Sequence, residues 1–238
     1  MKKSIIILVS LLSFITVAAQ IKVDNETKRV LTHFMSEAGV NTDSYNKEDS
    51  YRSFLYSMDD TQFDWSQSEN KTTKVMLKNQ GLILENKIKG ATACSVVELP
   101  VNLEREDFIY GVTFLDAELG DDVNIGLLFD YENNHNYKGI GISKKQFRYF
   151  SCKDNVTSDI KTGLIKYKGK VLNLLMERKQ GKVFFYINDI EIAKFNRVKI
   201  DNEFFGVYLY GKGKTTIPYF IFNIPQKDGD SEESTSDM

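Results

Sequence analysis

Carboxylates are the groups in this chain best suited to chemistry, with 33 Asp and Glu residues among 238. Two carboxyl groups about 5 Å apart can cleave a glycosidic bond, one as nucleophile and one as acid and base. Asp130 and Glu177 form such a pair if their segments are neighbouring strands; otherwise both are surface charges, as most acids are. A serine or cysteine nucleophile usually needs a base, and the two histidines, His33 and His135, lie in unrelated segments. The sequence therefore leans away from an enzyme.

The segment DYENNHNYKG, residues 130–139, is rich in side chains that contact sugars. Amide and imidazole groups hydrogen-bond to hydroxyls, and aromatic rings pack on the C–H faces of sugar rings. His135 and Tyr137 are therefore candidate ligand-binding residues. The alternative is a solvated hairpin end in which the asparagines serve the turn.

Four acids in this region could supply oxygen ligands to Ca²⁺: Asp121, Asp122, Asp130 and Glu132. No loop has a recognisable calcium-binding spacing. Zinc would need more ligands than two cysteines and two distant histidines supply. Calcium is thus the one cofactor considered, and otherwise none is expected.

Cys94 and Cys152 are the only cysteines. In an oxidising compartment they could form a disulfide, which would stabilise the fold by about 4 kcal/mol. The alternative is two separate buried thiols, because pairing depends on a Cα separation that the sequence does not give.

Residues 1–19 have the pattern of a secretory leader. Lys2 and Lys3 precede an apolar run over residues 5–17, and cleavage is expected after Ala19. A membrane anchor is the alternative, but the run is shorter than the span of about 20 residues that a bilayer needs. The leader predicts an exported chain, whether periplasmic, at the cell surface or secreted, with no transmembrane segment after cleavage.

Charge argues against nucleic acid as a partner. The 31 Lys and Arg residues and the 33 Asp and Glu residues are spread along the chain, with a net charge of −2, so they form no basic stripe. The tail, residues 226–238, is acidic and polar and is expected to be disordered.

The elements that must position these residues are one helix and then many strands. Apolar residues recur at helical spacing over residues 24–39, so residues 20–60 are predicted to form a helix and a linker. From Thr73 the apolar period becomes two, which predicts on the order of a dozen antiparallel strands. One pair is expected between residues 108–118 and 123–132. The second of these places Ile125, Leu127, Phe129 and Tyr131 on one face.

The stretch KVFFYINDIEIAKF, residues 182–195, reads as strand, two-residue turn and strand. Asn188 and Asp189 would occupy the turn, where positive φ values are usual. If Val183, Phe185 and Ile187 point inward, alternation places the residues between them on the outer face.

The same alternation gives the main candidate binding surface. If the late strands share one sheet, its outer face carries Tyr186, Tyr208, Tyr210, Asn173 and Glu177. Aromatic rings next to amides and acids suit saccharides. The alternative is that the N-terminal helix or residues 41–60 cover this face.

The hairpin occurs with FDW (63–65), GLILE (81–85), GLLFDYENNHNYKGIGI (126–142) and FFGVYLY (204–210). Their order over residues 62–224 resembles the concanavalin A-like jelly roll, and within it the laminin G-like domains of bacterial exported proteins. The resemblance implies an all-β antiparallel sandwich over residues 61–225, with a glycan or a protein on its concave face or loop rim. A well-known family of hydrolases with this fold carries Glu-x-Asp-x-x-Glu, and none of the fifteen glutamates here has Asp two positions later.

These features predict an exported, non-enzymatic module that binds a glycan or a surface protein through one face of the sandwich. Two alternatives stay open, since a fold does not specify a function. One is a carbohydrate-processing hydrolase or lyase with a non-standard carboxylate pair. The other is a structural protein of an envelope or matrix.

Overall fold

The structure, a computed structural model, describes residues 51–58, 63–78, 81–103, 107–116, 119–165, 171–188, 190–196 and 198–225. The predicted leader, the helix predicted over residues 24–39 and the acidic tail lie outside the described residues.

The described residues form sixteen strands and no helix. In chain order these are β1 (Tyr51–Ser57), β2 (Ser68–Glu69), β3 (Thr73–Lys78), β4 (Gly81–Asn86), β5 (Thr92–Glu98), β6 (Phe108–Leu115), β7 (Asn124–Asn133), β8 (Asn136–Ile142), β9 (Gln146–Lys153), β10 (Val156–Leu164), β11 (Val171–Lys179), β12 (Lys182–Ile187), β13 (Ile190–Asn196), β14 (Phe204–Tyr210), β15 (Gly213–Ile217) and β16 (Tyr219–Pro225). This part of the chain accordingly contains no helix that is long and apolar enough to cross a membrane.

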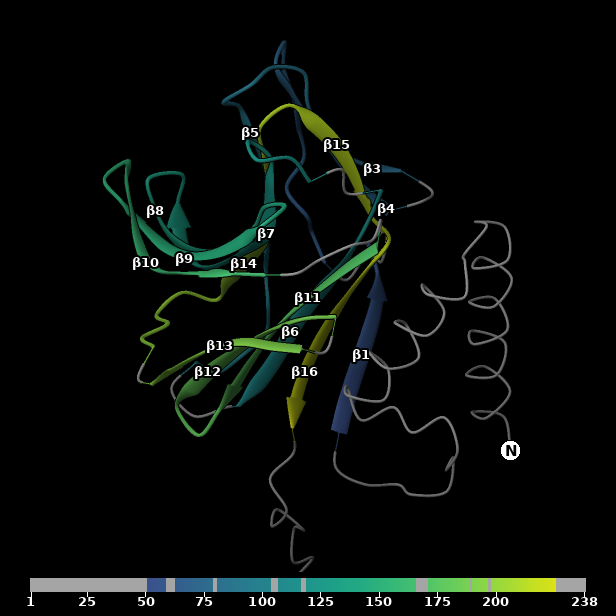
Figure 1. Cartoon of the computed structure of the whole chain (residues 1–238). Coiled ribbons are helices and arrows are strands. Elements are labelled where there is room, and N and C mark those ends of the chain that lie inside the picture. Colours follow the sequence, from purple (N-terminus) through teal and green to yellow (C-terminus); the bar gives the residue numbers. More distant parts are fainter. Residues whose placement is uncertain are drawn as a thin grey trace, which may run out of the picture.

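The strands form two antiparallel sheets (Figure 1). The ten-stranded sheet has the order β13-β12-β11-β6-β15-β4-β3-β2, and β16 also pairs with β6 and carries β1 on its other side. The six-stranded sheet has the order β10-β9-β8-β7-β14-β5. The predicted all-β antiparallel sandwich is confirmed.

The core lies between the sheets because each strand directs alternate apolar side chains toward the other sheet. Phe205 of β14 packs edge-on against Phe108 and Tyr110 of β6, with ring centroids 5.4 and 5.2 Å apart. The Tyr110 hydroxyl donates a hydrogen bond of 3.0 Å to the carbonyl of Gly206. These contacts join β6 to β14 and so fix how the two sheets face each other.

The predicted hairpin at residues 182–195 is confirmed as β12 and β13. Ile187 pairs with Ile190 across the turn, and Asn188 has a φ of 43°. Residues other than glycine seldom adopt a positive φ, and Asn does so more readily than most. Val183, Phe185 and Ile187 are buried, as alternation predicted.

Two predictions about the strands are wrong. Residues 51–57, expected in a linker, form β1, which pairs with β16. The pair expected between residues 108–118 and 123–132 does not form, because β6 belongs to the ten-stranded sheet and β7 to the six-stranded sheet. A period of two does not distinguish a hairpin from a crossing between sheets, since both leave the alternation unchanged.

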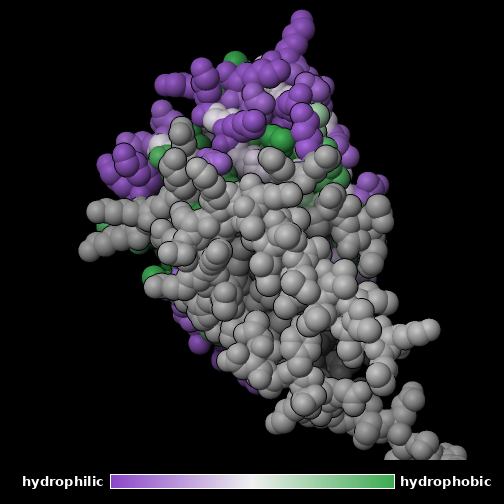
Figure 2. Space-filling model, turned by 90° about the vertical axis from the view of Figure 1, so that its right-hand side faces the viewer, coloured by the Kyte–Doolittle hydropathy of each residue, from purple (hydrophilic) through white to green (hydrophobic). Residues whose placement is uncertain are grey.

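The end of the molecule near β3, β5 and β15 has a mostly hydrophilic surface. Figure 2 views the molecule from the right-hand side of Figure 1, and a few hydrophobic side chains show between the hydrophilic ones at its upper end. Scattered exposed apolar side chains are ordinary on protein surfaces. A larger gathering of aromatic side chains lies on the six-stranded sheet.

Candidate functional site

The face of the six-stranded sheet that points away from the core holds a groove of about 860 Å³. Figure 1 shows this sheet curving so that the face is concave. Residues from all six strands line the groove, and residues 66–73 border it. We call it the concave groove.

The floor of the concave groove is aromatic and apolar. Tyr208, Phe150 and Leu128 form it and are each at most 5% exposed. Phe150 meets Tyr208 edge-on, with ring centroids 5.8 Å apart, and meets Tyr137 edge-on at 6.2 Å. Tyr137 in turn stacks against Tyr131 at 6.0 Å. The aromatic surface is therefore continuous from Tyr208 to Tyr131.

Glycines allow the side chains of the floor to lie close to the sheet. Gly126 of β7 pairs with Gly141 of β8. A Cβ on Gly126 would lie 2.6 Å from Cε1 of Tyr208, and a Cβ on Gly141 would collide with the Tyr208 hydroxyl. Gly139 leaves the same kind of space for Phe150, whose Cζ would lie 2.6 Å from an added Cβ.

Tyr131 reaches the groove through a β-bulge in β7. The pairing of β7 with β8 shifts between Phe129 and Asn133, and Asp130 has a φ of 50°. Residues 130–132 of β7 stand opposite the single residue Tyr137 of β8, and a bulge of this kind re-aims the side chains within it. Tyr131 was expected on the same face as Phe129, and this expectation is wrong, because Phe129 is buried in the core and Tyr131 lines the groove. Its hydroxyl donates a hydrogen bond of 2.6 Å to Oδ1 of Asn134.

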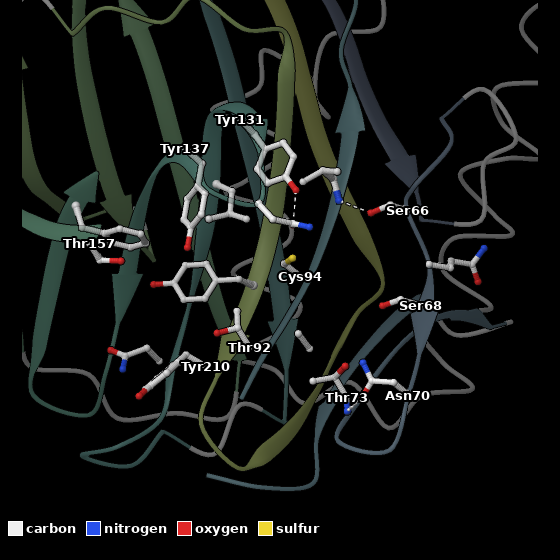
Figure 3. A pocket seen from close by; sticks show the side chains of 18 of the residues that line it. Ser66, Ser68, Asn70, Thr73, Thr92, Cys94, Tyr131, Tyr137, Thr157 and Tyr210 are labelled. Carbon is white, nitrogen blue, oxygen red and sulfur yellow. Dashed lines mark hydrogen bonds between the residues drawn. The ribbon is translucent and has the colours of Figure 1, made fainter. Parts of the chain in front are cut away.

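Residues 66–73 form the opposite border of the groove. Oγ of Ser66 accepts a hydrogen bond of 2.9 Å from the N–H of Val96. The Ser66 carbonyl accepts one of 2.6 Å from Oγ of Ser95. These bonds hold the segment against the free edge of β5. Figure 3 shows Ser66, Ser68 and Asn70 on one side of the groove and the labelled tyrosines on the other.

Burial raises the pKa of three tyrosines in the groove. Burial, with a contribution from the thiol of Cys152, raises the pKa of Tyr137 to about 12. Burial also raises the pKa of Tyr131 and that of Tyr208. Near neutral pH all three therefore carry a neutral hydroxyl, which can both donate and accept a hydrogen bond.

The five residues predicted to share one outer face lie on two different sheets. Tyr208 and Tyr210 belong to β14 and line the concave groove. Asn173, Glu177 and Tyr186 belong to β11 and β12 in the ten-stranded sheet. Each side chain points away from the core as predicted, but the assumption that these strands share a sheet is wrong.

The residues on the ten-stranded sheet also make contacts of their own. Asn173 is 1% exposed, and its Oδ1 accepts a hydrogen bond of 2.9 Å from Thr113. The Tyr186 hydroxyl donates one of 2.9 Å to Glu177. Glu177 does not neighbour Asp130, because β11 and β7 lie in different sheets. The carboxylate pair considered for catalysis is therefore wrong.

His135 and Tyr137 have different surroundings. His135 is exposed in the turn between β7 and β8, with Nδ1 2.5 Å from Oδ1 of Asn155. It is not among the described residues that line the groove, whereas Tyr137 and Asn134 are. Of the two candidates in this segment, the structure places only Tyr137 in the groove.

The four acids considered as calcium ligands do not come together. Asp121, Asp122 and Glu132 are exposed. Asp130 instead accepts a hydrogen bond of 2.7 Å from Lys138 and others from the 198–203 connection. Within the described ranges, no three His, Cys, Asp or Glu side chains gather in a way that could hold a metal ion.

Cys94 and Cys152 are free thiols. Cys94 lies on β5 and Cys152 on β9, with β14, β7 and β8 between them. Neighbouring strands lie about 4.8 Å apart, and a disulfide needs a Cα separation below about 7 Å. The disulfide candidate is therefore wrong, and the alternative of two separate thiols holds.

Much of the groove was not foreseen from the sequence, including Arg148, Phe150 and the 66–73 border. In β9 the buried core residues Phe147 and Tyr149 alternate with Arg148 and Phe150. Period two could therefore have placed the latter on the groove face. The 66–73 border carries no such signal, because most of it lies outside long strands.

Comparison with known proteins shows similarity of fold. No protein-family model matches the chain, and neither does any curated protein. A Bacillus subtilis protein of unknown function with a galectin-like fold has a TM-score of 0.52 at 10% identity, over 76% of this chain and 99% of that one. The carbohydrate recognition domain of Emp47p has a TM-score of 0.52 at 9% identity, over 74% of this chain and 95% of that one. A Shewanella oneidensis MR-1 protein of unknown function has a TM-score of 0.51 at 10% identity, over 85% of this chain and 95% of that one.

These structures are similar to this chain over most of their length and of its own. The resemblance drawn from the strand order is confirmed at the level of the fold. The chain has the concanavalin A-like jelly-roll fold.

Proposed function

We propose that this protein binds a saccharide in the concave groove and does not cleave it. The observation that carries the proposal is the continuous aromatic surface from Tyr208 through Phe150 and Tyr137 to Tyr131. Hydroxyl and amide side chains border this surface, including Ser66.

The chemistry of the groove suits a sugar chain. The C–H faces of sugar rings pack on aromatic side chains, and their hydroxyls need partners that both donate and accept. The neutral tyrosine hydroxyls and the amides of Asn124 and Asn134 provide such partners. The volume of about 860 Å³ lies within the range of small-molecule sites, about 300–1,000 Å³. One of the similar structures is itself a carbohydrate recognition domain, which supports saccharides as the first ligand class to test.

Binding without cleavage is favoured by the composition of the lining. Hydrolysis of a glycosidic bond usually requires two carboxyl groups beside the scissile bond. None of the described residues that line the groove is Asp or Glu. With the leader predicted for residues 1–19, we further propose that binding takes place outside the cytoplasm.

The test is a glycan array probed with the full chain, followed by calorimetric titration of the saccharides that bind and by analysis of products. We expect saturable binding and no released products. Tyr137→Ala and Tyr210→Ala should each weaken binding at least tenfold, because truncating an aromatic anchor typically costs more than about 1 kcal/mol.

Tyr186→Ala is the matched control, since Tyr186 lies on the ten-stranded sheet. Its affinity should equal that of the wild type. An array without any bound saccharide would overturn the proposal. So would a loss of binding in Tyr186→Ala with none in Tyr137→Ala, or the release of cleaved sugar.

A further inference from the structure

Arg148 is the one charged side chain among the described residues that line the concave groove. It projects from β9, and its guanidinium carbon lies 4.9 Å from the centre of the Phe150 ring. The side chain is 32% exposed. A cation therefore stands over part of the aromatic floor, where it could meet a ligand.

Asp159 of β10 neutralises this cation. Nε of Arg148 donates a hydrogen bond of 2.8 Å to Oδ1 of Asp159, and Nη2 lies 2.5 Å from the same oxygen. Asp159 pairs directly with Phe150 across the two strands, so the sheet register places the carboxylate beside the ring that Arg148 covers. Asp159 itself is not among the described lining residues.

The pair has a consequence for ligand choice. An anionic group that enters a groove loses water, and a free cation is the partner that best offsets this cost. Nε and Nη2 of Arg148 are directed at the carboxylate of Asp159, so the pair presents no net positive charge to a ligand. The remaining polar groups of the lining are hydroxyls and amides, which match sugar hydroxyls.

We infer that the concave groove selects uncharged saccharides over anionic ones, and that Asp159 is a specificity-determining residue because it cancels the charge of Arg148. The inference rests on the proposed function, since it concerns the ligand of the same groove. It assigns to Asp159 a role in selectivity without contact with the ligand.

The test compares matched probes: neutral glucan and galactan oligosaccharides, and the same oligosaccharides with C6 oxidised to carboxylate. The wild-type chain should bind the neutral form of its saccharide about tenfold more tightly than the carboxylate form. Asp159→Asn keeps the shape of the side chain and removes its charge. It should shift the affinity ratio toward the carboxylate by about tenfold, as expected for a new hydrogen bond between charged groups.

Two further variants separate a local effect from a change in net charge. Asp121→Asn removes the same charge from a side chain that is 72% exposed and lies outside the described lining, so the ratio should stay at the wild-type value. Arg148→Gln combined with Asp159→Asn should restore the preference for the neutral form. Circular dichroism confirms that each variant is folded.

The inference is overturned if the wild type prefers the carboxylate forms, a result that leaves saccharide binding intact. It is also overturned if Asp159→Asn does not shift the ratio, or if Asp121→Asn shifts it equally. If neither form binds the wild type or any variant, the proposed function fails and the inference fails with it.

Discussion

The ring of Tyr208 lies on the sheet because glycines leave room beneath it. Tyr208 is 5% exposed, and a Cβ on Gly141 would collide with its hydroxyl. Gly126 pairs with both Tyr208 and Gly141 and opens the space under the ring. Glycine weakens the interior of a strand, and it often marks a place where another group approaches the backbone closely. The close approach of this ring accounts for Gly141, whereas an added Cβ on Gly126 would also collide with the carbonyl oxygen of Ile140.

We expect Gly141→Ala to displace Tyr208 and to weaken saccharide binding. The added methyl group and the hydroxyl cannot occupy the same space, and overpacking of this kind destabilises a fold by about 1–3 kcal/mol. Denaturant unfolding measures the loss of stability, and near-ultraviolet circular dichroism reports the changed surroundings of the tyrosines. Calorimetric titration should show a lower affinity for the saccharide identified on the array.

Gly213→Ala is the matched control for this substitution. Gly213 lies in β15, and the atoms nearest to an added Cβ are 3.9 Å away, so a methyl group fits there. Its stability and affinity should stay close to those of the wild type. If Gly141→Ala proved as stable as Gly213→Ala, the close approach of Tyr208 to the sheet would be refuted.

At the scale of elements, the carboxylate of Asp130 holds the bulge of β7 in place. Lys138 of β8 donates a hydrogen bond of 2.7 Å to its Oδ2. The N–H groups of Asp201 and Asn202 donate to its Oδ1 at 2.8 and 3.0 Å. Asp130 thereby ties β7 and β8 to the connection between β13 and β14. This anchoring sets the orientation of Tyr131, the next residue in the chain.

We expect Asp130 to make stability depend on pH. Burial alone would raise the pKa of its carboxyl group, but the hydrogen bonds from Lys138, Asp201 and Asn202 outweigh burial and lower that pKa. A carboxyl whose pKa in the folded chain lies below the unfolded value, about 3.9, stabilises the fold above that pH. The stabilisation is lost as the pH falls through the folded-state pKa. Asp130→Asn should therefore cost about 1–3 kcal/mol at neutral pH, and the difference should shrink below about pH 4.

Urea unfolding of both proteins across the acidic range measures this difference. Asp121→Asn serves as the control, because the Asp121 side chain is 72% exposed. Its free energy of unfolding should follow that of the wild type at every pH. A difference between Asp130→Asn and the wild type that stayed constant down to about pH 3 would contradict the assigned role of the charge.

Alternation along single strands predicted the hairpin of β12 and β13, the buried face of β12 and the outward direction of Tyr208 and Tyr210 in β14. It failed at Tyr131, because β7 bulges there, with residues 130–132 opposite the single residue Tyr137 of β8, and the bulge interrupts the alternation of side chains. The bulge depends on hydrogen bonds between Asp130 and Asn202, which are 72 positions apart. The alternation of residues within one strand gives no information about a contact between residues so far apart in the sequence.

At the scale of the whole molecule, the packing of two sheets decides which sheet each strand joins. β12 and β13 pair with each other in the ten-stranded sheet, whereas β14, the next strand, crosses to the six-stranded sheet. There its Phe205 packs against Phe108 and Tyr110 of β6. The crossing separates Tyr186 from Tyr208, although both point away from the core as predicted. It also joins Tyr208 to Phe150 and Tyr137 and so creates the groove.

The same strand order predicts that reducing agents leave the stability of the protein unchanged. Three strands separate Cys94 on β5 from Cys152 on β9, which is too far for a disulfide. The melting temperature should therefore be equal with and without dithiothreitol, whereas breaking a disulfide that closes a loop of this length would cost about 4 kcal/mol.

A count of free thiols tests the same strand order. Protein unfolded without reductant should show two thiols to a chromogenic disulfide reagent, and Cys152→Ser should show one. In the folded protein Cys94 should react slowly, because burial raises the pKa of its thiol and the thiolate is the reactive form. If the protein unfolded without reductant showed no free thiol, and if reduction lowered its melting temperature, Cys94 and Cys152 would be joined by a disulfide. β5 and β9 would then lie side by side, contrary to the sheet order that builds the groove.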